Sequence, residues 1–124
     1  MRNFREFEAG PDPFGRTWRV YFKWLQTGIT LRHADTVDVK FAVEYDGRRE
    51  EKILALPHPR LLTLSKTTGH RLTDAWCARL AAMHLKRMIE TGEDIEKRLV
   101  TLSARDMAAY DAEMASEGAA KAGR

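Results

Sequence analysis

One histidine and one aspartate lie close enough in the sequence to suggest a metal site. His33 and Asp35 are two positions apart, so on a strand both side chains would share a face and could bind a metal ion. A third ligand would have to come from His58, His70 or His84, and the spacing favours none of the three. A metal-dependent enzyme around His33, Asp35 and His84 is therefore the third hypothesis for function.

His84 has a second interpretation, because it lies near the middle of the apolar arc of a helix predicted over residues 74–91. A histidine in that place is expected to be buried and hydrogen-bonded to a partner, as buried polar groups normally are. Cys77 cannot share a metal ion with His84. Seven residues of helix span about 10.5 Å, whereas a zinc–ligand bond measures about 2 Å.

The sequence contains none of the short motifs of the common enzyme classes, such as G-x-S-x-G, H-E-x-x-H, G-x-G-x-x-G and C-x-x-C. The segment 66–69 (Lys-Thr-Thr-Gly) lacks the earlier glycines that a phosphate-binding loop requires. These observations favour a non-catalytic protein over an enzyme. No cofactor and no small-molecule ligand are indicated.

Charge is segregated along the chain, although the net charge is only +3. Residues 52–89 contain seven basic side chains and one acidic, whereas residues 90–124 contain five basic and eight acidic. This pattern favours either an anionic partner or packing of the acidic segment on the basic one, within the chain or in a second copy. The alternative function is thus a nucleic-acid-binding domain. Its candidate phosphate contacts are Arg60, Lys66, Arg71, Arg79, Lys86 and Arg87, and Tyr21 could stack on bases if it faces solvent.

Two groups of apolar side chains could contact a partner. Phe4, Phe7 and Phe14 lie in an expected irregular arm, residues 1–16, and could pin it to the core or to another chain. Met107, Tyr110 and Met114 form a narrow stripe at helical spacing, which is more often used for packing within a chain. The preferred function is a non-catalytic protein-interaction or assembly module. Its expected partner is a second copy, as a symmetric dimer, or another protein.

A sheet is predicted over residues 17–56. Trp18, Val20, Phe22 and Trp24 alternate with more polar positions and define one apolar face. The segment 27–28 (Thr-Gly) then predicts a short hairpin loop, which would place Phe22 opposite His33. The odd-numbered positions of residues 29–45 are also largely apolar, so one strand with a bend near residues 34–35 is expected, with two strands as the alternative.

Asp46-Gly47 predicts the next hairpin turn, with a return strand over residues 51–56. The register of this hairpin has two solutions. A two-residue turn places Lys52 opposite Phe41, and a three-residue loop places Ile53 there. The second solution matches the apolar faces better and is preferred.

Helices are predicted after the sheet, which ends at Pro57-His58-Pro59. Their ranges are about 59–67, 74–91 and 104–116, and residues 93–99 could add one or two helical turns. Thr73 and Ser103 are the expected N-caps, and Gly92 the expected end of the second helix. Strands followed by helices predict an α+β fold: an antiparallel meander of three to four strands, with the helical half packed on one face.

The domain organisation follows from these elements. Residues 1–16 are the arm, residues 17–117 one α+β domain, and residues 118–124 a frayed tail. Hydrophobic residues make up 44% and charged residues 31% of the chain, as in ordinary globular domains. No apolar run approaches the roughly 18–20 residues of a membrane span, the first residues are too polar for a secretion signal, and one cysteine forms no internal disulfide. A small soluble, cytoplasmic protein without a membrane partner is therefore expected.

Overall fold

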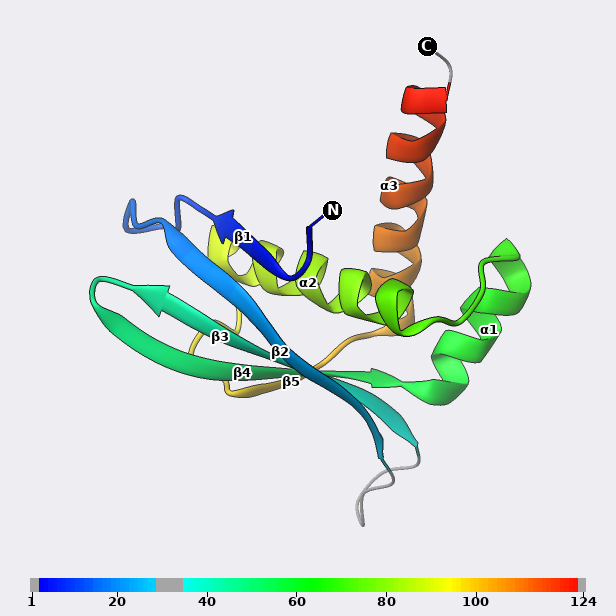
Figure 1. The fold of residues 1–124 in the computed structure, drawn as a ribbon, viewed down its shortest axis with the longest axis horizontal. Coiled ribbons are helices and arrows are strands. Elements are labelled where there is room, and N and C mark those ends of the chain that lie inside the picture. The colour runs from blue at the N-terminus through cyan, green and yellow to red at the C-terminus, as the bar shows by residue number, and fades with distance from the viewer. Residues whose placement is uncertain (1–2, 29–34, 123–124) are drawn as a thin grey trace.

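The fold was determined as a computed structural model, which describes residues 3–28 and 35–122, the last five of them by their backbone alone (Figure 1). The chain is an α+β protein, as the order of strand and helix signals predicts. Five strands and three helices are described, and their bounds are β1 (Glu6–Ala9), β2 (Trp18–Gly28), β3 (Thr36–Tyr45), β4 (Arg48–Pro57), α1 (His58–Thr68), α2 (Asp74–Thr91), β5 (Leu99–Thr101) and α3 (Ala104–Ala122).

The strands form one sheet in the order β1-β2-β3-β4-β5. The first four are antiparallel neighbours, and β5 pairs with β4 in parallel. Two strands lie where the sequence predicted other structure: β1 within the expected irregular arm, and β5 at the end of the segment expected to be helical. Strands of four and three residues are too short for their side chains to show a period of two.

The β3–β4 hairpin corrects the predicted register. Asp46 and Gly47 alone form the turn, with φ angles of 49° and 72°, so that Phe41 pairs with Lys52. Lys52 therefore lies on the core face with only 2% of its surface exposed. Its ammonium group donates hydrogen bonds to the carbonyl oxygens of Ile95 and Lys97 (3.0 Å for Lys97), in the loop after α2. The loop thus supplies the acceptors that a buried lysine requires.

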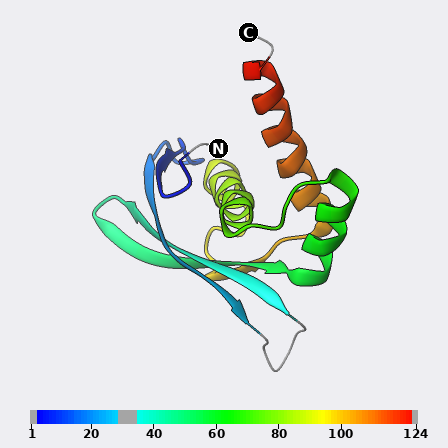
Figure 2. The same ribbon diagram turned by 45° about the vertical axis from the view of Figure 1, so that its right-hand side comes forward.

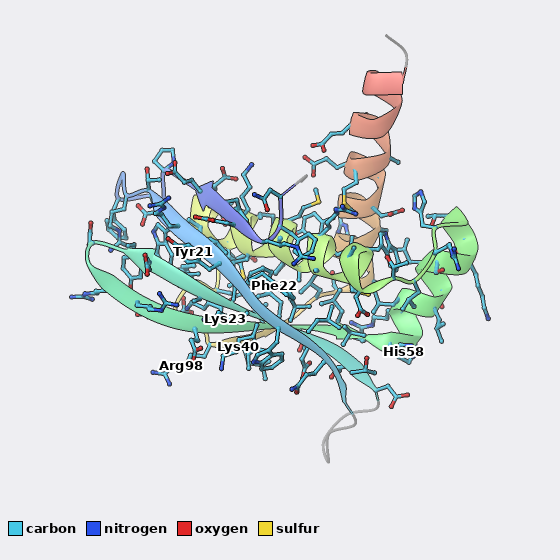
Figure 3. All side chains as sticks on the ribbon, viewed as in Figure 1. Tyr21, Phe22, Lys23, Lys40, His58 and Arg98 are labelled. Atoms are coloured by element: carbon cyan, nitrogen blue, oxygen red, sulfur yellow. The ribbon has the colours of Figure 1, made fainter. Side chains whose placement is uncertain are left out.

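A β-bulge in β2 corrects a second prediction. The pairing shifts between Phe22, which pairs with Phe41, and Trp24, which pairs with Lys40. The extra residue turns Trp24 to the outer face of the sheet, away from the core face on which the alternation placed it. Figure 3 shows Lys40 among the side chains of the sheet. Its ammonium group lies 5.5 Å from the Trp24 ring centroid.

The connection between β2 and β3 also differs from the prediction. Thr27 and Gly28 pair with Val37 and Thr36 as part of the strand, so they do not form the predicted hairpin loop. Residues 29–34, which include the start of the predicted apolar run and part of the predicted bend, lie outside the described residues, and the described part of the run forms β3. Phe22 accordingly lies opposite Phe41 and not opposite His33.

The helices begin and end close to the predicted positions, because local signals define them. The Thr73 hydroxyl accepts a hydrogen bond from Trp76 N–H at 3.2 Å, and Gly92 ends α2 in the left-handed conformation. The Ser103 hydroxyl accepts from Asp106 N–H at 3.0 Å at the start of α3. Helix α3 then continues through Ala122, six residues beyond its predicted end.

Helix α2 lies across one face of the sheet and forms the core with it (Figures 1 and 2). Leu80, Leu85 and Ile89 of α2 are fully buried, as are Val39 and Phe41 of β3. Both views show the distal half of α3 projecting away from this body. In the described part of the chain, no helix combines the length and apolarity that crossing a bilayer requires.

Candidate functional site

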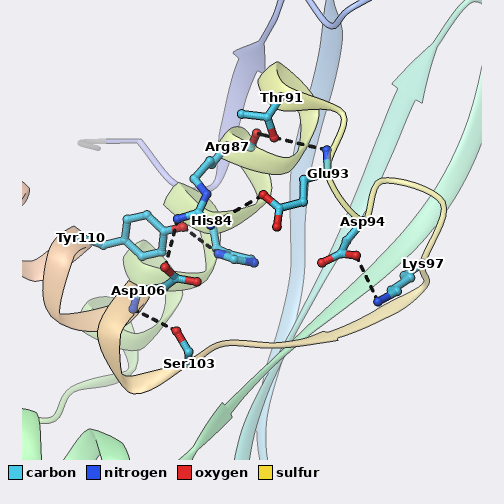
Figure 4. A network of polar contacts seen from close by, with 9 residues as sticks. All are labelled: His84, Arg87, Thr91, Glu93, Asp94, Lys97, Ser103, Asp106 and Tyr110. Carbon is cyan, nitrogen blue, oxygen red and sulfur yellow. Dashed lines mark hydrogen bonds and ion pairs between the residues drawn. The ribbon is translucent and has the colours of Figure 1, made fainter.

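A polar network joins the second half of α2 to the start of α3 (Figure 4). At its centre, His84 is 6% exposed, and its Nδ1 lies 2.6 Å from the Tyr110 hydroxyl of α3. The prediction of a buried, hydrogen-bonded histidine is therefore confirmed. Burial, and next the nearby Arg87 charge, lower the pKa of His84 below its ordinary value. The imidazole is accordingly neutral near pH 7.

Arg87 is the cation of this network. Its guanidinium donates to the Asp106 carboxylate at 3.1 Å and lies 3.9 Å from Glu93. The bond to Asp106 raises the pKa of Arg87. Burial opposes ionisation of Asp106, but the hydrogen bond and charge of Arg87 outweigh it and lower the pKa of this carboxyl group. Both groups therefore stay charged and tie α2 to α3.

A cavity of about 90 Å³ lies beside His84. Its lining comes from α2, the loop after it, β5 and the start of α3, and includes Asp94 and Ser103. No buried side-chain nitrogen or oxygen lacks a hydrogen-bond partner among the residues described. Since Tyr110 occupies Nδ1, the Nε2 atom of His84 faces this cavity, on the side of the ring that points away from Tyr110 (Figure 4). At about 30 Å³ for each water molecule, the cavity has the size of a small water cluster.

A groove of about 330 Å³ runs between α2 and α3 above this network. Met83 and Tyr110, both largely buried, supply its apolar floor. Charged side chains from both helices form its rim: Lys86, Arg87, Glu90, Glu113 and Glu117. The groove thus combines an apolar base with a charged border, as many protein-binding surfaces do.

A second histidine contact anchors α3 near the start of α2. Asp111 is buried, and its carboxylate lies 2.9 Å from Nδ1 of His70, in the connection between α1 and α2. The Trp76 indole N–H donates to the same carboxylate at 2.8 Å. Asp111 therefore connects α3 to both the α1–α2 connection and α2.

The six basic side chains predicted to contact phosphate lie along two helices and their connection. Arg60 and Lys66 belong to α1, and Arg71 follows it. The other three lie on α2, where Arg87 is thirteen residues from the first residue of the helix, about 20 Å along its axis. Arg79 lies 5.8 Å from the Phe4 ring, and Arg87 is paired with Asp106. The structure therefore does not bring the six together at one point.

The outer face of the sheet is the other surface with aromatic side chains. Tyr21 pairs with Ala42 and Trp24 with Lys40, so both rings lie on this face. Three of its cations are paired with carboxylates: Arg49 with Glu44 at 2.7 Å, Lys40 with Glu51 at 3.2 Å, and Arg19 with Glu6 at 3.8 Å. Pairing of this kind reduces the attraction of the face for phosphate groups.

The aromatic arm packs mainly on its own chain. Phe4 is buried and meets Phe22 edge to face, with ring centroids 5.4 Å apart, and Phe7 packs against the core. The buried Asp12 carboxylate accepts hydrogen bonds from Arg16 at 2.7 Å and from the Trp18 indole at 2.9 Å. These contacts hold the arm against β2. Phe14, by contrast, is 82% exposed and available to a partner.

The predicted apolar stripe on α3 also packs mainly on its own chain. Met107 and Tyr110 are buried within the chain, and Met114 is half-buried against the core. The first two side chains therefore do not present a surface to a partner. Their packing explains why α3 stays attached over its first two turns.

The predicted metal site lies partly outside the described residues. His33 lies outside the described residues, and the Asp35 carbonyl oxygen accepts a hydrogen bond from His58 N–H at 2.9 Å. Over residues 3–28 and 35–122, no group of three or more histidine, cysteine, aspartate or glutamate side chains could hold a metal ion. Burial raises the pKa of the Cys77 thiol to about 12, which keeps it protonated and unreactive.

The partners of His84 and His70 were missed from the sequence. The helical pattern places Tyr110 in an apolar stripe, Asp106 fits a capping box with Ser103, and nothing in the sequence indicates Asp111 as a partner of His70. Helical spacing is the one usable signal, because Asp106 and Tyr110 are four residues apart and share a face of α3. That spacing indicates which side of the helix is polar, but not which helix it meets.

Comparisons with protein-family models, with curated proteins and with solved structures found no match to this chain. The function of the chain is therefore inferred from the geometry of its own residues, above all from α2, α3 and the groove between them.

Proposed function

We propose that this chain is a non-catalytic assembly module that forms a symmetric homodimer through α3 and the α2–α3 groove. The two α3 helices lie antiparallel, and the distal half of each helix closes the groove of the other copy. Such an interface uses the same patch on both copies, as a two-fold dimer requires.

The observation that carries the proposal is the course of α3. The helix runs through Ala122, yet its side chains at residues 115–117 are exposed and its distal half projects from the body (Figure 2). Short helical segments are marginal in water, and most helices gain their stability from packing. A projecting helical segment is therefore best explained by a surface on which it docks.

The groove offers such a surface. Its floor of Met83 and Tyr110 is apolar, whereas its open side borders the projecting part of α3. A second α3 laid along the groove would cover the part of this floor that is still exposed, 8% of Met83 and 5% of Tyr110, and its own half-buried Met114 would lose contact with water there, which favours association.

Charge supports the same arrangement. Lys86 is exposed on α2, and Arg79 lies seven residues before it on the same helical face. Glu113 and Glu117 border the same groove from α3, so the patch carries both signs of charge, and two copies related by a two-fold axis can set opposite charges against each other. Complementary charge of this kind orients an interface and excludes mismatched partners.

The test is light scattering on a sizing column, with the full chain at low and high salt and absorbance read at 260 and 280 nm. A dimer mass that persists at high salt is expected. A variant that ends at Ala115 should elute as a monomer, and its melting temperature should change by only a few degrees, about 2–4 °C, because the removed segment lies outside the core. Leu62→Ser is the matched control, since it changes an exposed apolar side chain on α1 and should leave the dimer intact.

Two outcomes would overturn the proposal. One is a full chain that stays monomeric at every concentration tested, and the other is a dimer that survives the truncation. A monomer that carries nucleic acid at low salt and releases it at high salt would instead favour the alternative function, phosphate contact through the basic 52–89 segment.

A further inference from the structure

Two histidines anchor α3, and they use their protons differently. His70 donates to the Asp111 carboxylate, which can only accept. His84 instead meets the hydroxyl of Tyr110 at 2.6 Å, with no carboxylate between them. The direction of the first hydrogen bond is therefore fixed, whereas the second depends on which atom holds the proton.

The distance between His84 and Tyr110 indicates which group donates. At 2.6 Å it falls in the range of hydrogen bonds donated by a hydroxyl and below the roughly 2.7–3.2 Å of bonds that an N–H donates to oxygen. The Tyr110 hydroxyl therefore donates its proton to Nδ1 of His84. The neutral imidazole must accept at Nδ1 and carry its single proton on Nε2, which faces the 90 Å³ cavity.

Four elements surround His84, and three of them place charged or titratable groups near it. Helix α2 contributes Arg87, the loop after α2 contributes Glu93 and Asp94, and α3 contributes Asp106 and Tyr110. Strand β5 contributes only the uncharged Val100 and Thr101. The carboxylates are already engaged. Arg87 holds Asp106 at 3.1 Å and lies 3.9 Å from Glu93, and Lys97 holds Asp94 at 3.0 Å. A second proton on His84 would thus place a buried cation beside Arg87 with no free carboxylate among these residues.

We propose that His84 and Tyr110 form an acid-sensitive latch, which holds α3 against α2 while the imidazole is neutral and opens when His84 is protonated. Protonation removes the acceptor at Nδ1, so Tyr110 loses the partner for its proton. Asp111 keeps its bonds to His70 and Trp76, so the opening is confined to the contact between α2 and the start of α3.

The direction of the pH effect follows from the lowered pKa of His84 in the closed state. The open state exposes an imidazole of ordinary pKa, about 6.5, and therefore binds the proton more tightly. The ratio of open to closed protein is constant above that pH and rises as the pH falls below it, by up to about tenfold for each pH unit.

Amide hydrogen exchange of the full chain between pH 8 and pH 5 tests the latch, with each rate corrected for the intrinsic pH dependence of exchange. The amides of residues 104–111 should lose up to about tenfold of their protection for each pH unit below 6.5, while the amides of β3 keep theirs. In His84→Gln the pH effect should disappear, because glutamine can still accept from Tyr110 and takes up no proton. His58→Gln is the control and should behave as the unchanged chain.

A direct titration of His84 by NMR keeps the test decisive even if the glutamine variant fails to fold. The imidazole should titrate below 6.5 and report a neutral ring with its proton on Nε2. Equal loss of protection in the His84→Gln variant, or an ordinary titration of His84, would overturn the latch. These measurements are made on the monomer, at a concentration below that of self-association. Their result can therefore contradict the latch while the dimer proposal holds, and the dimer proposal can fail while the latch is supported.

Discussion

Lys52 shows how a charged side chain comes to lie on the apolar face of a sheet. Its register opposite Phe41 directs the side chain into the core, where burial lowers the pKa of the ammonium group. The ammonium group donates hydrogen bonds to the carbonyl oxygens of Ile95 and Lys97, and it lies 3.7 Å from the Glu50 carboxylate. These contacts offset the cost of burying its charge. Lys52 thereby fixes the loop that leads from α2 to β5.

Replacing this lysine by an apolar side chain of similar length tests that role. Lys52→Met leaves two carbonyl oxygens without their donor, and we expect the free energy of unfolding to fall by about 1–3 kcal/mol in urea denaturation. Lys40→Met is the control, since Lys40 forms an ion pair with Glu51 on the outer face and should cost at most about 1 kcal/mol. A stabilising Lys52→Met would show that the loop carbonyls find other donors.

At the scale of the elements, single residues decide how strands and helices meet. The bulge between Phe22 and Trp24 changes which face of the sheet carries a tryptophan. Gly92, with a φ of 77°, ends α2 and lies close to the arm, because a Cβ atom at this position would come within 2.9 Å of the Pro13 side chain. Gly69 ends α1 with the same φ, but a Cβ atom there would meet nothing within 4 Å among the described residues.

These two glycines form a matched pair for a measurement. Gly69→Ala should lower the free energy of unfolding by about 1–2 kcal/mol, because a residue with a side chain is unfavourable in the left-handed region. Gly92→Ala should cost about 1–3 kcal/mol more, because the new methyl group must displace Pro13. Equal losses in thermal or urea unfolding would mean that the arm moves aside freely and contributes little to the end of α2.

At the scale of the whole molecule, the first half of α3 packs against the rest of the protein, whereas its second half extends away from it. Met107, Tyr110 and Asp111 are buried, whereas the side chains at residues 115–117 are exposed. The helix therefore has two tasks: its first turns complete the core, and in the proposed dimer its distal half contacts a second copy.

Two methionines of α3 separate these tasks. Met107→Ala should lower the free energy of unfolding by about 2–5 kcal/mol, since it opens a cavity in the core. Met114→Ala, at a half-buried position, should cost about 1 kcal/mol, because less apolar area leaves water there. Similar losses for the two variants would indicate that the distal part of α3 is packed as tightly as the first turns.

The class of fold and the ends of the helices follow from the sequence, since the signals that define them are local. Thr73, Ser103 and Gly92 cap helices through contacts with residues at most four positions away. The order of strand and helix patterns predicts the α+β class for the same reason. The burial of His84 could be predicted too, because helical periodicity places it among apolar side chains.

The tertiary structure alone decided the rest, because each remaining feature depends on residues far apart in the chain. The Lys52 ammonium group finds its acceptors in carbonyl oxygens more than forty residues later, and His84 takes Tyr110, twenty-six residues later, as its partner. The strand β5 exists because β4 offers an edge to it, and not because three residues have a pattern. The sequence determines which side chains must be buried or capped, whereas the partners that satisfy them are determined only when the elements pack.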